Sequence, residues 1–256
     1  MFRYYNVMLF DRAHILFLLI TFVLIITLEI VAFFTVKDND KKAMILKIAA
    51  VLTVVIHYSS LYVEYFKTGK AEVDNTMLLP VYPCNIAMWL LLIVAFMKNK
   101  DNKVYQVMAE FTFYLGIVGG IVGILFNEIY ASTPDLSDWS VLKGLLSHST
   151  MLFGAVYLLV GNLIKIRVRN TISVLIGMVL MVLDGAIVIG LYQAFRLDPP
   201  NTMYLMTPPY PNLPWLNTWV IGITAVLLVF AITAVYEQIA IKKEDRWYNH
   251  LKGGKK

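Results

Sequence analysis

Seven long apolar runs constrain this chain more than any other feature of its sequence. A helix that spans a membrane needs about 20 mostly apolar residues, because it rises about 1.5 Å per residue across a hydrocarbon layer of about 30 Å. Of the 256 residues, 59% are hydrophobic and only 15% are charged, whereas about a quarter of a water-soluble domain is charged. The sequence therefore predicts an all-α, polytopic membrane protein with seven transmembrane helices. We expect these helices at residues 14–34, 43–66, 77–97, 104–126, 145–166, 171–195 and 215–241.

The seven spans leave little room for any other module. We expect residues 1–241 to form a single transmembrane domain and residues 242–256 to form a basic cytoplasmic tail. The first apolar run ends at Phe33-Phe34-Thr35-Val36, which is no small-residue cleavage site. We therefore expect a retained span there and not a signal peptide.

The distribution of Lys and Arg predicts the orientation of the bundle. Six of the 22 basic residues lie in the N-terminal segment and in the loops after the second, fourth and sixth spans. The other sixteen lie in the remaining loops and at the C-terminus, and cytoplasmic loops carry the excess of basic residues. The N-terminus is thus predicted outside and the C-terminus inside a cell membrane. The net charge of +5 suits contact with membrane phospholipids, and we expect no nucleic-acid partner.

The two longest loops, residues 127–144 and 196–214, are then predicted to face outward. Both carry Trp, Tyr, Pro and Asp in place of an excess of Lys and Arg. This composition suits short re-entrant or interfacial structure that forms a lid, or else an ordinary belt of aromatic side chains at the membrane surface.

Polar residues inside the spans indicate a candidate site. An ionisable residue in a membrane is costly, so it marks a functional hypothesis by default. At about 1.5 Å per residue, Cys84 lies about 10 Å and His148 about 5 Å from the predicted outer ends of their helices. His57 and Asp184 lie at about 14 and 16 Å. Four helices thus present polar groups in the same outer half of the membrane. The full set is His57, Glu64, Cys84, Asn85, Asn127, His148 and Asp184.

Cys84 carries the strongest local argument for chemistry. Pro80 and Pro83 predict that the third helix is broken or begins there, and Pro83 suits the first helical position because its missing N–H needs no partner. The positive end of the helix dipole favours the thiolate of a first-turn cysteine, which is the form that attacks an acyl carbonyl. Burial opposes the thiolate, so a base is needed, and His148 or His57 can supply it. The alternative is that Cys84 is a small buried hydrophobic residue.

Other side chains have structural interpretations. Asp184 and His57 can each bond a neighbouring helix. The glutamates toward the inner side, Glu29, Glu110 and Glu237, are expected to pair with loop lysines. Two overlapping pairs in residues 104–126, Gly116 with Gly120 and Gly119 with Gly123, are typical of closely packed helices.

The sequence lacks the motifs that are typical of several function classes. The last span contains no lysine for a retinal Schiff base, and the chain has neither a His-Glu-x-x-His pair nor a Gly-rich phosphate loop. No internal repeat points to an inverted-repeat transporter. We expect no cofactor and no metal.

Three segments in this order resemble a known family. They are Leu79–Asn85 (LPVYPCN), Ser147–Gly154 (SHSTMLFG) and Asn201–Pro209 (NTMYLMTPP). They resemble the YwaF-like family of bacterial integral membrane proteins, which looks related to the eukaryotic transmembrane protein 164 group. The resemblance runs from about the second span to the seventh.

This resemblance implies a seven-helix protein and, from the eukaryotic relatives, acyl transfer in phospholipid metabolism with a cysteine nucleophile. The matching positions are Cys84 as nucleophile and His148 as its base. Asn201 and Tyr204 lie in the third segment and are candidates for substrate binding. Family members often have Asn-Tyr where this chain has Asn201-Thr202.

Two functional hypotheses follow, with a third behind them. The first is an acyltransferase or transacylase that acts on phospholipid acyl chains through Cys84 in an outward-facing pocket, with Asn85 helping to hold the oxyanion. The second is a transporter or receptor-like protein that binds a small solute, ion or proton in the same pocket. A metal site formed by two histidines and a carboxylate is the third, and the spacing of these residues gives it no support. The second hypothesis uses His57, Glu64, His148 and Asp184.

Overall fold

The computed structural model describes residues 9–69, 80–209, 214, 215 and 217–248. Within these ranges the chain forms helices and connecting turns and contains no strand, as predicted for an all-α protein. The α-helices are α1 (Arg12–Thr35), α2 (Asn39–Thr68), α4 (Pro83–Phe96), α5 (Lys103–Leu125), α6 (Glu128–Ser132), α7 (Trp139–Val160), α8 (Thr171–Ala194) and α9 (Thr218–Ala240). Three short 3₁₀ turns accompany them, η1 (Val168–Asn170), η2 (Thr202–Tyr204) and η3 (Lys243–Asp245).

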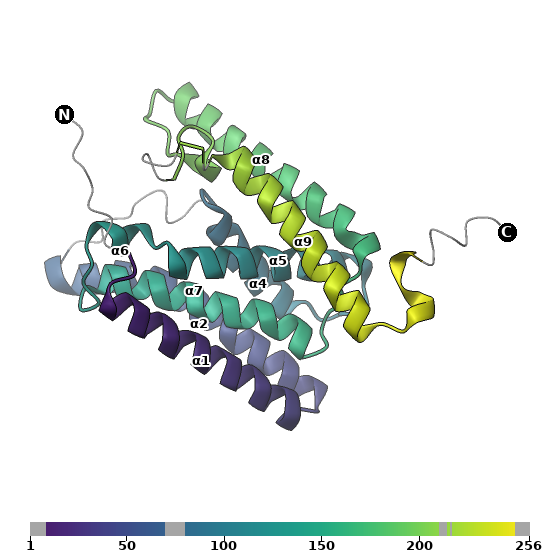
Figure 1. Ribbon diagram of the computed structural model, residues 1–256. Helices are drawn as coiled ribbons and strands as arrows, with labels where there is room; N and C mark the ends of the chain where they lie inside the picture. The colour runs from purple at the N-terminus through teal and green to yellow at the C-terminus, as the bar shows by residue number, and fades with distance from the viewer. Residues whose placement is uncertain (1–8, 70–79, 210–213, 216, 249–256) are drawn as a thin grey trace.

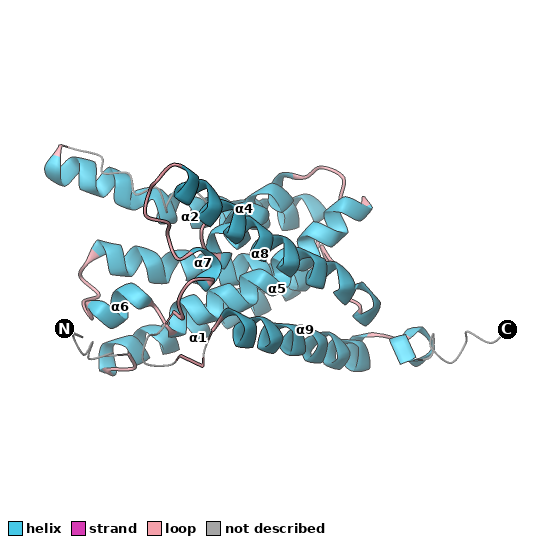
Figure 2. Ribbon diagram, turned by 90° about the horizontal axis from the view of Figure 1, so that it is seen from above, coloured by secondary structure: helices cyan, strands magenta, loops and turns pink. Residues whose placement is uncertain are grey.

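Helix α7 is the centre of the bundle. It packs against α1, α2, α4 and α5, and these five helices form one compact group in Figure 1. The view from above in Figure 2 shows the same helices side by side. Their shared core is apolar and includes the fully buried Leu46, Leu91, Tyr105 and Leu158. Helices α8 and α9 form a separate pair along one side of this group.

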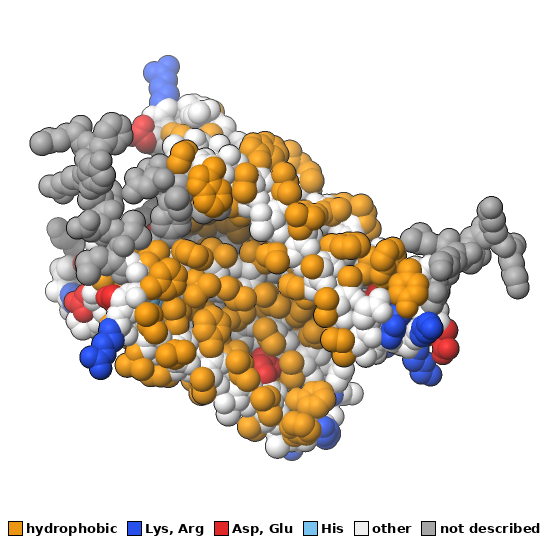
Figure 3. Space-filling view, in the orientation of Figure 1, with side chains coloured by type: hydrophobic (Ala, Val, Ile, Leu, Met, Phe, Trp, Pro, Cys, Tyr) orange, Lys and Arg blue, Asp and Glu red, His pale blue; other side chains and the backbone are white. Residues whose placement is uncertain are grey.

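The outer surface of the bundle suits a membrane. Six segments are long and apolar enough to cross one, and large hydrophobic side chains such as Leu19, Phe34, Ile187 and Leu227 are exposed on their outer faces. Figure 3 shows this apolar surface over the middle of the molecule, with most charged side chains toward its ends. The polytopic membrane fold is therefore confirmed, and the orientation and the division into domain and tail remain predictions.

The third predicted span, residues 77–97, is shorter than expected. Helix α4 begins at Pro83, as predicted for a helix that is broken or begins at the prolines. It has 14 residues and is about 21 Å long at 1.5 Å per residue, less than the roughly 30 Å of a hydrocarbon layer. Residues 77–79 of the predicted span lie outside the described ranges.

Helix α7 begins six residues before its predicted start at residue 145. Asp138 is its N-cap, since its side chain accepts a hydrogen bond from the backbone N–H of Ser140 at 2.8 Å. The hydroxyl of Ser149 bonds back to the carbonyl of Leu145 at 2.7 Å, within the helix. His148 consequently lies nine residues beyond Trp139, about 14 Å into the helix, and the predicted depth of about 5 Å was wrong.

Both long loops contain a short helical element, and their role as a lid or as an aromatic belt stays a prediction. Helix α6 follows α5 directly, and η2 lies between α8 and α9. The two elements lie at the same end of the bundle as the start of α4, which we call the loop end. The N–H of Met203 in η2 donates to the carbonyl of Val81 at 2.9 Å, so η2 is bonded to the segment that leads into Cys84.

The α8–α9 pair is attached to the bundle mainly near its two ends. At the loop end, Met203 of η2 packs against Gly185 of α8, and its N–H bonds the carbonyl of Val81 in the bundle. At the opposite end, the ring of Phe111 in α5 packs against Gly177 of α8. The Tyr114 hydroxyl of α5 also bonds the Thr233 hydroxyl of α9 there.

Glu237 of α9 adds a further bond at that opposite end. Its carboxylate accepts from the N–H groups of Val168 at 2.8 Å and Trp247 at 3.0 Å. The prediction that this buried glutamate pairs with a loop lysine was therefore wrong, because its acceptors are satisfied by backbone donors.

Candidate functional site

A large cavity lies between α5 and the α8–α9 pair. Its volume is about 2290 Å³, and along α8 and α9 its lining is almost entirely apolar, with residues such as Met178, Val182 and Ala225. Val179, Ile223 and Leu227 also line it and are exposed, so the cavity opens sideways through the apolar outer surface. Its shape and lining suit a hydrocarbon chain that enters from a membrane.

The polar residues of the cavity gather near the loop end. Five of the nine residues predicted from the sequence line it. They come from α2, α4, the end of α5, α7 and η2. The five are His57, Cys84, Asn127, His148 and Tyr204.

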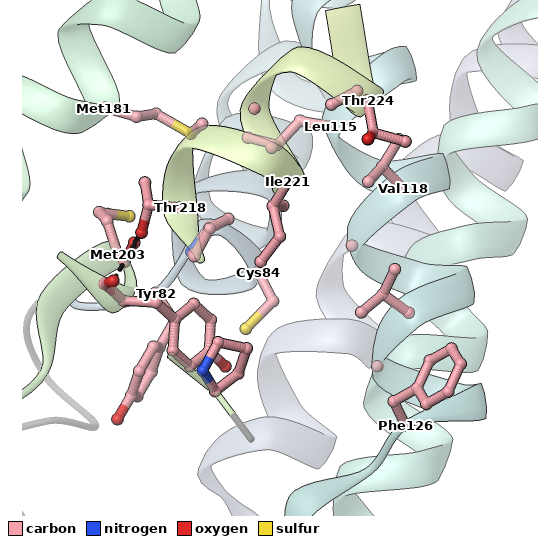
Figure 4. Close-up of a pocket in the computed structure, with 18 of the residues that line it drawn as sticks. Tyr82, Cys84, Leu115, Val118, Phe126, Met181, Met203, Thr218, Ile221 and Thr224 are labelled. Atoms are coloured by element: carbon pink, nitrogen blue, oxygen red, sulfur yellow. Dashed lines mark hydrogen bonds between the residues drawn. The ribbon is translucent and has the colours of Figure 1, made fainter. Parts of the chain in front are cut away.

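Cys84 lies in the first turn of α4, and its sulfur faces the cavity. Figure 4 shows it between Tyr82 on one side and Val118 and Phe126 of α5 on the other. The thiol donates to Asn85 Oδ1 at the long distance of 3.7 Å. Tyr82 supplies no side-chain cap to α4, and the helix begins with a proline. Six other helices have Asp or Asn side-chain caps, whereas α4, like α8, has none, so the N-terminal dipole of α4 is left open toward the cavity.

His148 and Cys84 pack along one face of α5. A Cβ built on Gly123 would overlap the His148 ring, with Cγ at 2.6 Å, and one built on Gly119 would lie 3.9 Å from the Cβ of Cys84. These two glycines are one helical turn apart, so the nucleophile and base candidates are neighbours on this face. The sequence predicted close packing at these glycines. It missed that Gly123 makes room for the imidazole ring, whereas Gly116 and Gly120 pack against α7.

The hydrogen bonds of His148 define its tautomer. Nδ1 lies 2.7 Å from the carbonyl oxygen of Gly144, and a carbonyl can only accept, so Nδ1 carries the proton. In the neutral ring, Nε2 therefore has a free lone pair. That is the form needed to take a proton from a thiol.

His57 faces the same end of the cavity from α2. Its Nε2 is buried and has no hydrogen-bond partner within the described part of the chain. Its backbone carbonyl accepts from Lys143 Nζ at 3.3 Å, and the same ammonium contacts Ser60 Oγ at 3.2 Å. Lys143 is a site residue that the sequence reasoning missed, because the late predicted start of α7 placed it in a loop.

A second missed residue is Glu128 of α6. Its Oε1 accepts from the Tyr204 hydroxyl at 3.1 Å, and the ring of Tyr204 packs against that of Tyr82 with centroids 5.4 Å apart. Burial raises the pKa of Tyr204 far above its ordinary value, so this hydroxyl remains a donor. The contact ties η2 to α6 at the loop end of the cavity.

Asn127 has a structural task at the cavity wall. Its Oδ1 caps α6 by accepting from the N–H of Tyr130 at 2.9 Å, and its Nδ2 donates to the carbonyl of Gly123 at 3.3 Å. It thereby fixes the last turn of α5, the segment against which His148 packs.

The other four predicted residues do not line the cavity. Asn85 is buried beside Cys84, and Asp184 is half-buried on α8 with Oδ2 enclosed. Glu64 is exposed on α2. Asn201 folds its own loop, since Nδ2 donates to the carbonyl of Thr207 at 2.9 Å. The pocket of two histidines and two carboxylates expected for a transporter is thus not assembled.

Within the described residues, no three His, Cys, Asp or Glu side chains are grouped so that they could hold a metal ion.

Comparison with known proteins agrees with the predicted relation to the transmembrane protein 164 group. The model of the TMEM164 family matches residues 9–236, which include every helix of the bundle except the last residues of α9. No curated protein and no solved structure matches the chain. The chain belongs to the TMEM164 family.

Proposed function

We propose that the protein is a membrane acyltransferase or transacylase that moves a fatty acyl chain from a phospholipid through a thioester on Cys84. The observation that carries the proposal is the joint position of Cys84 and His148. Both lie at the polar end of an apolar cavity that opens sideways, so one ligand can place an ester at the thiol and its chain along α8 and α9.

The first half of the reaction forms the acyl-enzyme. The thiol of Cys84 gives its proton to Nε2 of His148, and the thiolate attacks the ester carbonyl carbon. The uncapped N-terminus of α4 stabilises the oxyanion. The C–O bond of the ester then breaks, and His148 returns its proton to the leaving glycerol oxygen.

The second half transfers the acyl group. A hydroxyl of the acceptor gives its proton to His148, and its oxygen attacks the thioester carbonyl. The C–S bond breaks, the new ester leaves, and His148 reprotonates Cys84. Atoms and protons balance over the cycle, and no outside co-reactant is needed besides the two lipids.

The predicted orientation adds a consequence for the donor. With the N-terminus outside, the loop end faces outward, whereas acyl-CoA is cytosolic. The donor in this proposal is accordingly a phospholipid that is already in the membrane. The sideways opening of the cavity supports the same route.

The test is intact-protein mass spectrometry after incubation of the purified protein with phosphatidylcholine vesicles. We expect an added acyl mass on the wild-type protein that hydroxylamine removes, and none on Cys84→Ala. Gly190→Ala is the matched control, because a Cβ at Gly190 meets nothing within 4 Å and should leave the adduct unchanged. An adduct that persists in Cys84→Ala, or none on the wild type with any phospholipid class, refutes the proposal.

A further inference from the structure

A second, smaller cavity lies behind Cys84. Its volume is about 20 Å³, and a cavity needs roughly 10–15 Å³ to hold one water molecule. It lies where α2, α4 and α7 meet. Its lining consists of Thr53, His57, Cys84, Met88, Ser147, His148 and Met151.

We propose that this cavity binds a single internal water that joins Cys84, His148 and His57, and that His57 is the positioning residue that holds it. The role given to His148 rests on the proposed function, whereas the water site can be tested without it. A buried water typically makes about three hydrogen bonds to groups that otherwise lack partners, and this cavity offers three.

The polar groups of the lining divide into satisfied and available ones. The Thr53 hydroxyl already donates to the carbonyl of Ala49 at 2.8 Å, and the Ser147 hydroxyl donates to that of Gly144 at 3.0 Å. The available groups are the Nε2 atoms of the two histidines and the thiol. The enclosed Nε2 of His57 is the clearest of these, because leaving a buried polar atom unpaired costs about 1–3 kcal/mol.

The water completes a path for the thiol proton. The resting contact from Cys84 to Asn85 Oδ1 is long, at 3.7 Å, and rotation about the Cβ–Sγ bond turns the S–H toward the water. The water accepts that proton and passes one of its own to Nε2 of His148. A thiolate and an imidazolium result, and the third bond, to His57, keeps the water in line between them.

The titratable groups around this path come from several elements. Lys143 of α7 lies beside both histidines. Glu128 of α6 and Tyr204 of η2 face Cys84 across the larger cavity. These groups remain unchanged in the variants below, so any change in pH profile reports on the water site.

Cys84 is the only cysteine, so alkylation of the full-length protein in vesicles by iodoacetamide reports on this thiol alone. We expect His57→Leu to slow alkylation at neutral pH by about tenfold, the scale of one hydrogen bond, and to leave only the alkaline limb of the pH–rate profile. His57→Gln, which keeps a polar atom at the water, should restore most of the rate. Val55→Ala, on the exposed face of the same helix, is the control.

A pH–rate profile in His57→Leu equal to that of the wild type overturns the water site. Equal losses in His57→Leu and His57→Gln also overturn it, because they indicate a packing role. Alkylation that depends on His57 without any acyl adduct on Cys84 refutes acyl transfer and leaves the water site standing. An acyl adduct that forms equally well in His57→Leu refutes the water site and leaves acyl transfer standing.

Discussion

The close approach of His148 to Gly123 gives the sharpest prediction for activity. In Gly123→Ala the new methyl group occupies the space of the imidazole, whose Cγ would lie 2.6 Å away. Cδ2 and Nε2 of the ring would lie nearer still, so the ring must shift by about 1.5–2 Å to reach ordinary van der Waals contact at 3.5–4.0 Å. Because α5 is held by Asn127 at Gly123 itself, the ring and not the helix is expected to move.

The expected effects on stability and on activity differ in size. Overpacking a filled site lowers the folding stability by about 1–3 kcal/mol. Replacing a helical glycine by alanine raises the folding stability by about 0.5–1 kcal/mol. The net loss of stability is about 0–2.5 kcal/mol, which a folded bundle tolerates. A displacement of about 1 Å in a catalytic group can cost about 100-fold in rate. Acyl-enzyme formation should therefore fall by about 100-fold in a protein that still folds.

The assay measures the rate of thioester formation on Cys84 together with the melting temperature in detergent. Gly119→Ala is the matched control on the same face of α5, because its nearest neighbour would be Met151 Cε at an ordinary 3.5 Å. It should retain most of the rate. If Gly123→Ala forms the adduct as fast as Gly119→Ala does, His148 is not the base at this position.

Two further predictions concern contacts away from Cys84. Glu237→Gln replaces one acceptor oxygen by a donor and leaves a buried N–H unpaired, so it should cost about 1–3 kcal/mol in thermal unfolding, whereas the exposed Glu244→Gln should cost nothing measurable. Hydrogen bonds from the backbone of His14, and then from the Tyr130 hydroxyl, lower the pKa of Asp11 below its ordinary 3.8. Its stabilisation is complete above pH 3.8 and is lost below it, so the melting temperatures of wild type and Asp11→Ala should differ at neutral pH and converge on acidification.

The positions of the helices could be predicted because the length of each apolar run decides where a membrane helix lies. The errors arose where polar residues interrupt an apolar run. The fifth span was expected to begin at residue 145, yet α7 begins earlier, and the hydroxyls of Ser149 and Thr150 bond carbonyls inside it. The true signal was Asp138, a typical N-cap, followed by residues compatible with a helix. Recognising it would also have brought Lys143 into the helix.

The site could be predicted only in part. Cys84 and His148 stand out because they are rare polar groups in apolar runs, and both line the cavity. Glu64 and Asp184 stand out equally, yet Glu64 is exposed and Asp184 does not line the cavity. Depth along a helix follows from sequence spacing, whereas direction around it depends on which helices are neighbours. Only the fold supplies that information.

Helices α8 and α9 are attached to the bundle mainly near their two ends, so the cavity between them and α5 opens sideways. This opening has a consequence for the kinetics. A ligand that reaches Cys84 through the opening between these helices and α5 comes from the bilayer and not from the surrounding water. For such an enzyme the relevant substrate concentration is the mole fraction of the lipid in the membrane. Diluting the donor with an inert lipid at constant total substrate should then slow the reaction, and adding more vesicles of the same composition should leave the rate per protein unchanged.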